Sequence, residues 1–222
     1  MTDWLGRRKH PRYPIVVPIL YGVGSSEAAL VGAGWTRDSG EGGACFELPE
    51  RLEVSSLIRV LLRTDQGGIS TEGQVVWADR LLNTDGALCG VAFTQMVSAQ
   101  GQAIRAFLLR KRMVWQAVVR IPLELSLTYQ IKSQPRSHRQ GQTGNVSRRG
   151  LLLRLPLVSS PGTLLEVSLH TPHGHLAAEG MIVRVEPQEA QTPGGLIRHG
   201  FHFTDISHAT QMALARVLAE TH

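Results

Sequence analysis

The chain lacks several features that would place it in common classes of protein. It has no run of about 18 consecutive apolar residues, so no segment is predicted to span a membrane. Its first residues lack the apolar core of a signal peptide. It has two cysteines, Cys45 and Cys89, too few for a disulfide framework, and we interpret both as small buried apolar side chains. We therefore expect a cytoplasmic protein.

Motifs of known catalytic chemistry are also missing. The sequence contains neither a Gly-x-Ser-x-Gly nucleophile turn nor a phosphate-binding loop of the Walker type. Three histidines, His170, His173 and His175, lie close together, but no cysteine or carboxylate nearby completes a metal-ligand set. We interpret them as a solvated turn. We expect neither an enzyme nor a protein with a bound metal or cofactor.

Lysine is scarce, and this absence is informative about binding. Only three of the 23 basic residues are lysines, and the chain carries a net charge of +5 over 222 residues. Arginine presents a planar fork that holds a phosphate or a guanine edge through two parallel hydrogen bonds, whereas lysine is a point charge. The composition therefore permits an anionic partner, although a net charge this small is also compatible with an ordinary solvated surface.

What the chain does contain is an internal repeat. Residues 38–76 and 145–183 align without gaps at an offset of 107, with 11 of 39 positions identical. The match continues upstream, with one residue of slip, where Arg12-Tyr-Pro-Ile corresponds to Arg120-Ile-Pro-Leu. A repeat of this length indicates duplicated domains. We expect an N-terminal domain over residues 1–112 and a C-terminal domain over residues 113–222.

Each copy has the pattern of a small β-domain with one helix at its end. Residues 13–21 and 121–129 alternate between apolar and other side chains, as a strand with one buried face does. Further alternating segments, separated by turn residues, follow up to residues 93 and 203. An amphipathic stripe then appears in each copy, formed by Ile104, Phe107 and Leu108 and by Leu214, Val217 and Leu218. This order predicts an antiparallel barrel closed by a C-terminal helix.

Two short segments concentrate polar residues suited to binding. The first is Arg7-Arg8-Lys9-His10-Pro11-Arg12, directly before the first strand. The second is the turn from Asp38 to Gly43, whose counterpart is Asn145-Val146-Ser147-Arg148-Arg149-Gly150. Together they resemble the PilZ domain, the bacterial receptor module for cyclic di-GMP, which has an RxxxR segment followed by a [DN]xSxxG turn. The resemblance extends over nearly the whole chain, as two tandem copies.

The resemblance implies an all-β fold with little helix: two tandem six-stranded antiparallel barrels, each with a C-terminal helix. It also implies binding of cyclic di-GMP without catalysis. Arginine forks fit the O6 and N7 acceptors of guanine, and an Asp or Asn accepts from its N1–H and N2–H edge. The implied site residues of the first copy are Arg7, Arg8, Arg12, Asp38, Gly40, Gly43 and Trp77. Those of a possible second site are Arg120, Asn145, Ser147 and Gly150.

The two copies depart from the pattern in opposite ways. The first has both arginines, but Gly40 stands in the serine position. An alternative register would use Ser39 and Gly42 and put Arg37 in place of the acid; we prefer the register that keeps the 107 offset. The second has an intact turn, but Gln116 stands where the first arginine belongs. A missing arginine costs more than a missing hydroxyl, so we expect the first copy to be the main site.

Two alternatives remain open at this stage. A degenerate tandem protein that binds no nucleotide would act as an adaptor for a protein partner. A nucleic-acid-binding barrel is less favoured, because no aromatic stacking platform is visible. In the first interpretation the chain has no output domain, so it signals through an unidentified effector protein and controls motility, biofilm formation or polysaccharide production. A homodimer is possible.

Overall fold

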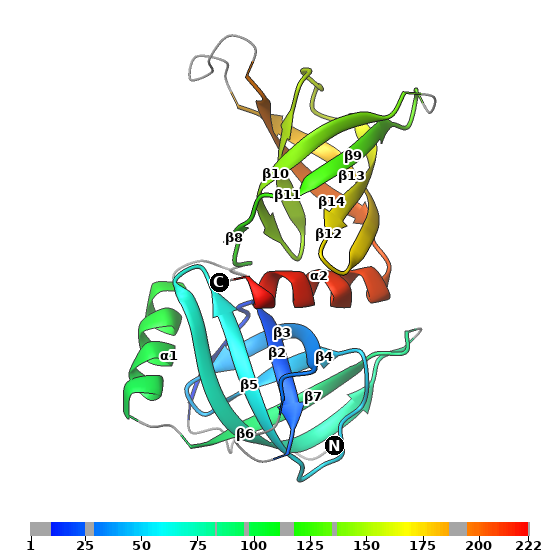
Figure 1. The fold of residues 1–222 in the computed structure, drawn as a ribbon. Helices are drawn as coiled ribbons and strands as arrows, with labels where there is room; N and C mark the ends of the chain where they lie inside the picture. Colours follow the sequence, from blue (N-terminus) through cyan, green and yellow to red (C-terminus); the bar gives the residue numbers. More distant parts are fainter. Residues whose placement is uncertain are drawn as a thin grey trace. The chain divides into compact units, whose positions relative to one another are not determined.

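The computed structural model describes residues 10–24, 29–82, 84–95, 98–111, 118–134, 137–186 and 195–221. These residues form two compact units that meet in sequence between Val119 and Arg120. The domain boundary expected at 112/113 falls on residues outside the described ranges. Each unit is mostly antiparallel sheet with one helix at its C-terminal end (Figure 1).

The first unit is a closed barrel of six strands. Around the ring the order is β3, β2, β5, β6, β7 and β4, and the β3–β4 pairing closes it. The short strand β1 is added to β3 outside the ring. The bounds are β1 Arg12–Tyr13, β2 Pro18–Val23, β3 Gly32–Gly40, β4 Gly43–Leu48, β5 Leu57–Thr64, β6 Gly67–Arg80 and β7 Ala87–Gln95, followed by helix α1 Ser98–Lys111.

The second unit repeats this ring with the strands in the same order. The strand order around the ring is β10, β9, β12, β13, β14 and β11, and the β10–β11 pairing closes it. The short strand β8 is added to β10. The bounds are β8 Ile121–Pro122, β9 Ser126–Ile131, β10 Arg139–Ser147, β11 Gly150–Leu155, β12 Leu164–Thr171, β13 Gly174–Val185 and β14 Ile197–Asp205, followed by α2 His208–Glu220. The expected pair of six-stranded barrels is confirmed.

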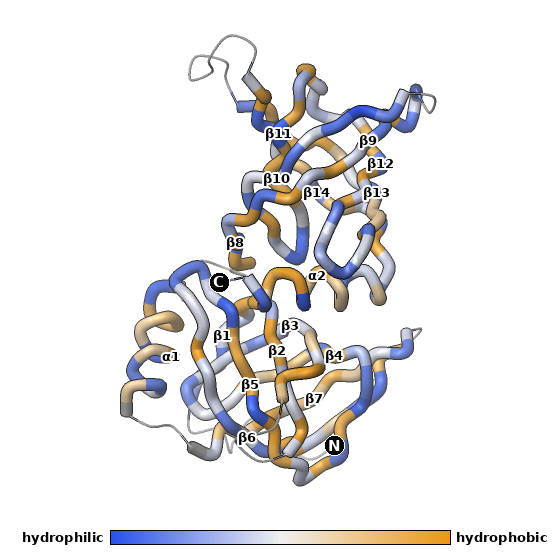
Figure 2. The backbone as a smooth tube through the Cα atoms, in the orientation of Figure 1, coloured by the Kyte–Doolittle hydropathy of each residue, from blue (hydrophilic) through white to orange (hydrophobic). Residues whose placement is uncertain are grey.

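Alternate side chains along the strands fill the interiors of both barrels. Hydrophobic and hydrophilic residues exchange places along the strands in Figure 2, and the inward set is almost completely buried, including Ile19, Trp35, Phe46 and Val60 in the first barrel. The apolar stripes expected on the two helices, at Ile104, Phe107 and Leu108 and at Leu214, Val217 and Leu218, are buried as well. Helix α1 packs on β3 and β6.

The first predicted strand of each copy is wrong in one respect, because it is interrupted. Residues between β1 and β2 leave the ladder at Pro14, where proline has no N–H to donate. The buried Thr36 replaces the missing ladder bonds: its Oγ1 donates to Ile15 O (2.6 Å) and accepts from Val17 N (2.9 Å). The break separates Arg12 from the barrel wall and directs it onto β3.

Thr143 does the same in the second copy. Its Oγ1 donates to Leu123 O (2.5 Å) and accepts from Leu125 N (2.9 Å), and it is fully buried. Thr36 and Thr143 are separated by the repeat offset of 107. The interruption is therefore a shared structural feature of both copies.

The second barrel contains a fully buried histidine. His199 is fully buried; its Nε2 accepts from Ser159 N (3.0 Å) and its Nδ1 lies 2.9 Å from Ile197 O. Since Nε2 accepts, the ring is neutral with its proton on Nδ1. Burial lowers the pKa of His199, opposed by the hydrogen bond to Ile197. The neutral ring is thus part of the folded state.

We expect this histidine to add an acid-side slope to the stability of the second barrel. The stabilisation is fully present above the ordinary histidine pKa of about 6.5 and is lost as the pH falls below it, by at most about 1.4 kcal/mol per pH unit. Urea unfolding between pH 7.5 and 5 measures it. In His199→Cys the slope should shrink, because a thiol stays neutral over this pH range. Cysteine suits the position, since Cys89 of the first barrel accepts the equivalent hydrogen bond from Leu52. An equal reduction in His202→Gln, an exposed neighbour on β14, would contradict this assignment.

Candidate functional site

The first candidate site is built on β1 and β3. Arg12 pairs with Gly40 in the antiparallel register of these strands, and its Nη1 donates to Asp38 Oδ1 at 3.1 Å. The same oxygen accepts from the backbone N–H of Cys45 on β4 (3.2 Å). The Arg12 side chain is 18% exposed and that of Asp38 33% exposed. The fork is therefore held in one orientation, and part of the arginine side chain is still exposed.

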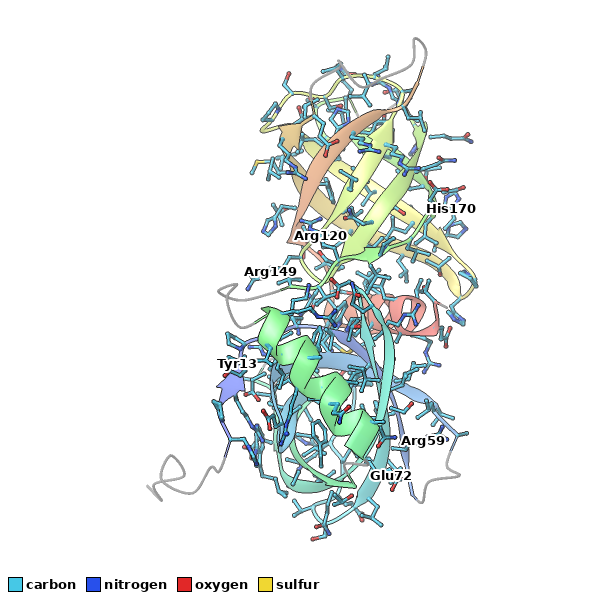
Figure 3. The ribbon with its side chains drawn as sticks, turned by 90° about the vertical axis from the view of Figure 1, so that its left-hand side faces the viewer. Tyr13, Arg59, Glu72, Arg120, Arg149 and His170 are labelled. Atoms are coloured by element: carbon cyan, nitrogen blue, oxygen red, sulfur yellow. The ribbon has the colours of Figure 1, made fainter. Side chains whose placement is uncertain are left out.

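The second repeat reproduces this pair. Arg120 Nη1 donates to Asn145 Oδ1, also at 3.1 Å. Arg12 lies in β1 and Arg120 lies directly ahead of β8; Figure 3 labels Arg120 and also Tyr13, the neighbour of Arg12. In both barrels the acceptor follows an irregularity in the strand, between Thr36 and Asp38 and between Thr143 and Asn145. A β-bulge redirects the side chain that follows it, and here it turns Asp38 and Asn145 toward the arginine.

Strand register agrees with the preferred alignment of the two turns. Gly43 begins β4 and Gly150 begins β11. A Cβ on Gly43 would lie 2.2 Å from Val91 O, and one on Gly150 would lie 2.1 Å from Phe201 O. Both glycines therefore allow the same close approach of two backbones. The alternative register, ending the turn at Gly42, lacks this approach, since a Cβ there meets only the ring of His10.

The residue that differs between the two turns has a local explanation. A Cβ on Gly40 would lie 2.5 Å from Pro11 O, so a serine there would collide with the backbone beside Arg12. In the second turn Ser147 is buried, and its hydroxyl donates to Gly150 O (3.0 Å). This hydroxyl closes the turn. Its loss at Gly40 removes a turn bond and leaves the Arg12–Asp38 pair in place.

Trp77 lies on the same row of the first barrel as Asp38. The row runs across four neighbouring strands through Asp38, Cys45, Gly90 and Trp77. The indole of Trp77 covers the Gly90 backbone, because a Cβ on that glycine would meet Trp77 Nε1 at 1.9 Å. Burial, and next the charge of Asp38, raise the pKa of Cys45 to about 12. The thiol beneath the pair is thus neutral, and the indole lies in the same row, on the third strand from Asp38.

The turn of the first copy is also tied to α1. Glu41 Oε2 accepts from Arg105 Nε at 2.7 Å and lies 3.8 Å from His10 Nδ1. In the second copy Arg148 Nη2 donates to Gln211 Oε1 of α2 at 3.3 Å. Sequence reasoning missed both tethers, because each joins residues more than 60 positions apart. Figure 3 labels Arg149, the exposed neighbour of Arg148 in this turn.

The other residues singled out from the sequence fall into two groups. Arg7 and Arg8 of the arm, and Gln116 of the second copy, are outside the described residues. His170 and His175 stack edge to face with ring centroids 4.6 Å apart, and His173 Nε2 contacts Glu220. Within the described ranges no three His, Cys, Asp or Glu residues are grouped as a metal site would require.

Comparison with known proteins places these two sites in a family. The model of the PilZ domain matches residues 6–110 and again residues 116–220. The chain therefore belongs to the PilZ family, as a tandem of two PilZ domains. PilZ domains are ligand-binding domains and not catalytic ones. None of the helices in the described part of the chain has the length and apolar character to cross a membrane.

Solved structures with a similar fold have low sequence identity. The PlzA protein of Borreliella burgdorferi in complex with c-di-GMP is 12% identical, covers 91% of this chain and 87% of its own, and has a TM-score of 0.40. The inhibitor of motility MotI/DgrA of Bacillus subtilis is 10% identical, with 91% and 94% covered and a TM-score of 0.39. YcgR of Escherichia coli in complex with c-di-GMP is 11% identical, with 91% and 82% covered and a TM-score of 0.38. No curated protein matches the chain.

Proposed function

We propose that this protein is a cytoplasmic receptor for cyclic di-GMP whose main site is in the first PilZ domain. The observation that carries the proposal is the Arg12–Asp38 pair, 3.1 Å apart on β1 and β3, together with its copy Arg120–Asn145. An arginine that is held by its neighbour and still accessible has little conformational freedom to lose when a ligand binds.

The chemistry of the pair matches that of the ligand. Cyclic di-GMP carries two phosphates and two guanines. The free edge of the Arg12 guanidinium offers parallel donors to guanine O6 and N7 or to a phosphate. The Asp38 oxygens accept from the N1–H and N2–H edge of guanine. Trp77, in the same row, offers a face for stacking, which contributes about 1–3 kcal/mol per base in nucleic-acid complexes.

The N-terminal arm completes the proposed site. His10 and Pro11 already lie against the turn, since they are the nearest neighbours of any side chain added at Gly42 and Gly40. Arg8 precedes His10 by two residues, a span of at most about 7 Å. We propose that Arg7 and Arg8, which precede His10 in the sequence, fold over a ligand on the Arg12–Asp38 pair.

The output would pass through another protein. Nothing in the site makes or breaks a bond, and ligand binding would change the arm and the turn that Arg105 ties to α1. Such a change is suited to control of an unidentified effector in motility, biofilm formation or polysaccharide production.

Isothermal titration of the purified chain with cyclic di-GMP tests the proposal. We expect micromolar or tighter binding and no comparable signal from GTP or cyclic di-AMP. Absence of heat with cyclic di-GMP would overturn the receptor function and leave the adaptor alternative. Equal binding of the three nucleotides would contradict guanine recognition by Arg12 and Asp38.

A further inference from the structure

The second domain has an arginine where the first has Trp77. Arg184 lies on β13 opposite Gly200, in a row that runs through Asn145, Leu152 and Gly200. A Cβ on Gly200 would meet Arg184 Cγ at 2.6 Å and its Nε at 3.0 Å. The arginine stem therefore lies flat on the Gly200 backbone, as the indole of Trp77 lies on Gly90.

Arg184 and Arg120 lie close enough to affect one another. Burial, and next the positive charge of Arg184, lower the pKa of Arg120. The Arg120 guanidinium is bonded to a neutral amide, that of Asn145, whereas Arg12 is bonded to a carboxylate. The second site thus keeps the positive charge that the first site neutralises.

The carboxylate that pairs with Arg184 is shared with a second arginine. Glu186 Oε1 lies 3.7 Å from Arg184 Nη2, and its Oε2 accepts from Arg198 Nη1 at 3.4 Å. Arg184 is 64% exposed and Arg198 is 53% exposed. Two arginines thus share one glutamate, so this carboxylate does not neutralise both of them. Like charges at close quarters repel, and a bound dianion would relieve that repulsion.

We propose that Arg184 supplies, from β13, the second cation of a cyclic di-GMP site on the second domain, in the role that Gln116 cannot fill. This inference rests on the proposed function and extends it to a second site. Arg184 and Arg120 hold the phosphates, and Asn145 faces a guanine edge.

Because Arg184 is exposed, its substitution tests binding without disturbing the barrel core. Full-length protein carrying Arg12→Ala, which disables the first site, is titrated with cyclic di-GMP at low salt, and Arg184→Ala is then added. We expect residual binding in the single variant and a further loss of about tenfold or more in affinity in the double variant, as expected for a lost charge-assisted hydrogen bond. Arg184→Lys should recover only part of it, because lysine lacks the fork.

Arg198→Ala is the matched control, because it removes another exposed arginine that contacts Glu186 from the neighbouring strand. It should leave most of the residual affinity. If Arg12→Ala alone removes all binding, or if Arg184→Ala has no more effect than Arg198→Ala, the second site is wrong while the receptor function stands. If the wild-type protein binds no cyclic di-GMP, both proposals fail.

Discussion

Replacing Arg12 by alanine should lower the affinity of the first domain for cyclic di-GMP by about 100-fold or more. The Arg12 side chain is only 18% exposed and is held by Asp38, so its orientation is fixed before the ligand arrives. Its removal deletes one or two charge-assisted hydrogen bonds of about 1.5–3 kcal/mol each. It also leaves the Asp38 carboxylate as an uncompensated negative charge facing an anionic ligand.

Three further variants separate the parts of this effect. Arg12→Lys keeps the charge and loses the fork, so it should recover little affinity. Arg8→Ala should weaken binding as Arg12→Ala does if the arm closes over the ligand, and Gln116→Ala should have little effect. Arg80→Ala, an exposed arginine at the end of β6, is the control for the loss of one surface charge. Titration calorimetry gives the affinities, and similar losses in Arg80→Ala and Arg12→Ala would contradict the assignment.

The repeat in the sequence predicted much of the backbone around the candidate site, because backbone features keep their spacing. Gly43 and Gly150 permit the same close approach, and the bulges before Asp38 and Asn145 occur at the same offset of 107. Strand alternation likewise predicted which residues of each barrel are buried. These features depend on local geometry, which identical residues at identical spacing repeat.

The parts that the sequence did not predict depend on tertiary contacts. The break between β1 and β2 is stabilised by a hydroxyl on β3, and the hydroxyl of Ser147 is used by its own turn. The pairing of Glu41 with Arg105 joins residues 64 positions apart. The proximity of Arg184 to Arg120 depends on strand order around the ring. No spacing rule within a single segment reveals these contacts.

The two domains therefore share a backbone arrangement but differ in the charge of the side chains placed on it. In the first, Arg12 is neutralised by Asp38 and the basic arm supplies further cations in sequence. In the second, Asn145 is neutral and Arg184 stands in the row where the first domain has an indole. Divergence after duplication has changed the side chains around the arginine while the bulge and the close-approach glycine have been kept.

Replacing Thr36 by valine should destabilise the first barrel by about 2–6 kcal/mol. Valine has nearly the same shape, so packing is preserved, but the hydroxyl that bonds Ile15 O and Val17 N is lost. Thr36 is fully buried, so water cannot replace it. Each buried backbone group left without a partner costs about 1–3 kcal/mol. Urea unfolding measures the change in the free energy of unfolding.

Thr36→Ser is the matched control, because it keeps the hydroxyl and removes only a methyl group. It should lose far less stability than the valine variant. Thr143→Val should reproduce the loss of stability in the second barrel, where the equivalent two bonds are made with Leu123 O and Leu125 N. Thr36→Val should also weaken ligand binding, because it releases the segment that positions Arg12. Equal stability of the valine and serine variants would show that the hydroxyl does not hold the break. The proposed effect of Thr36 on the position of Arg12 would then be wrong.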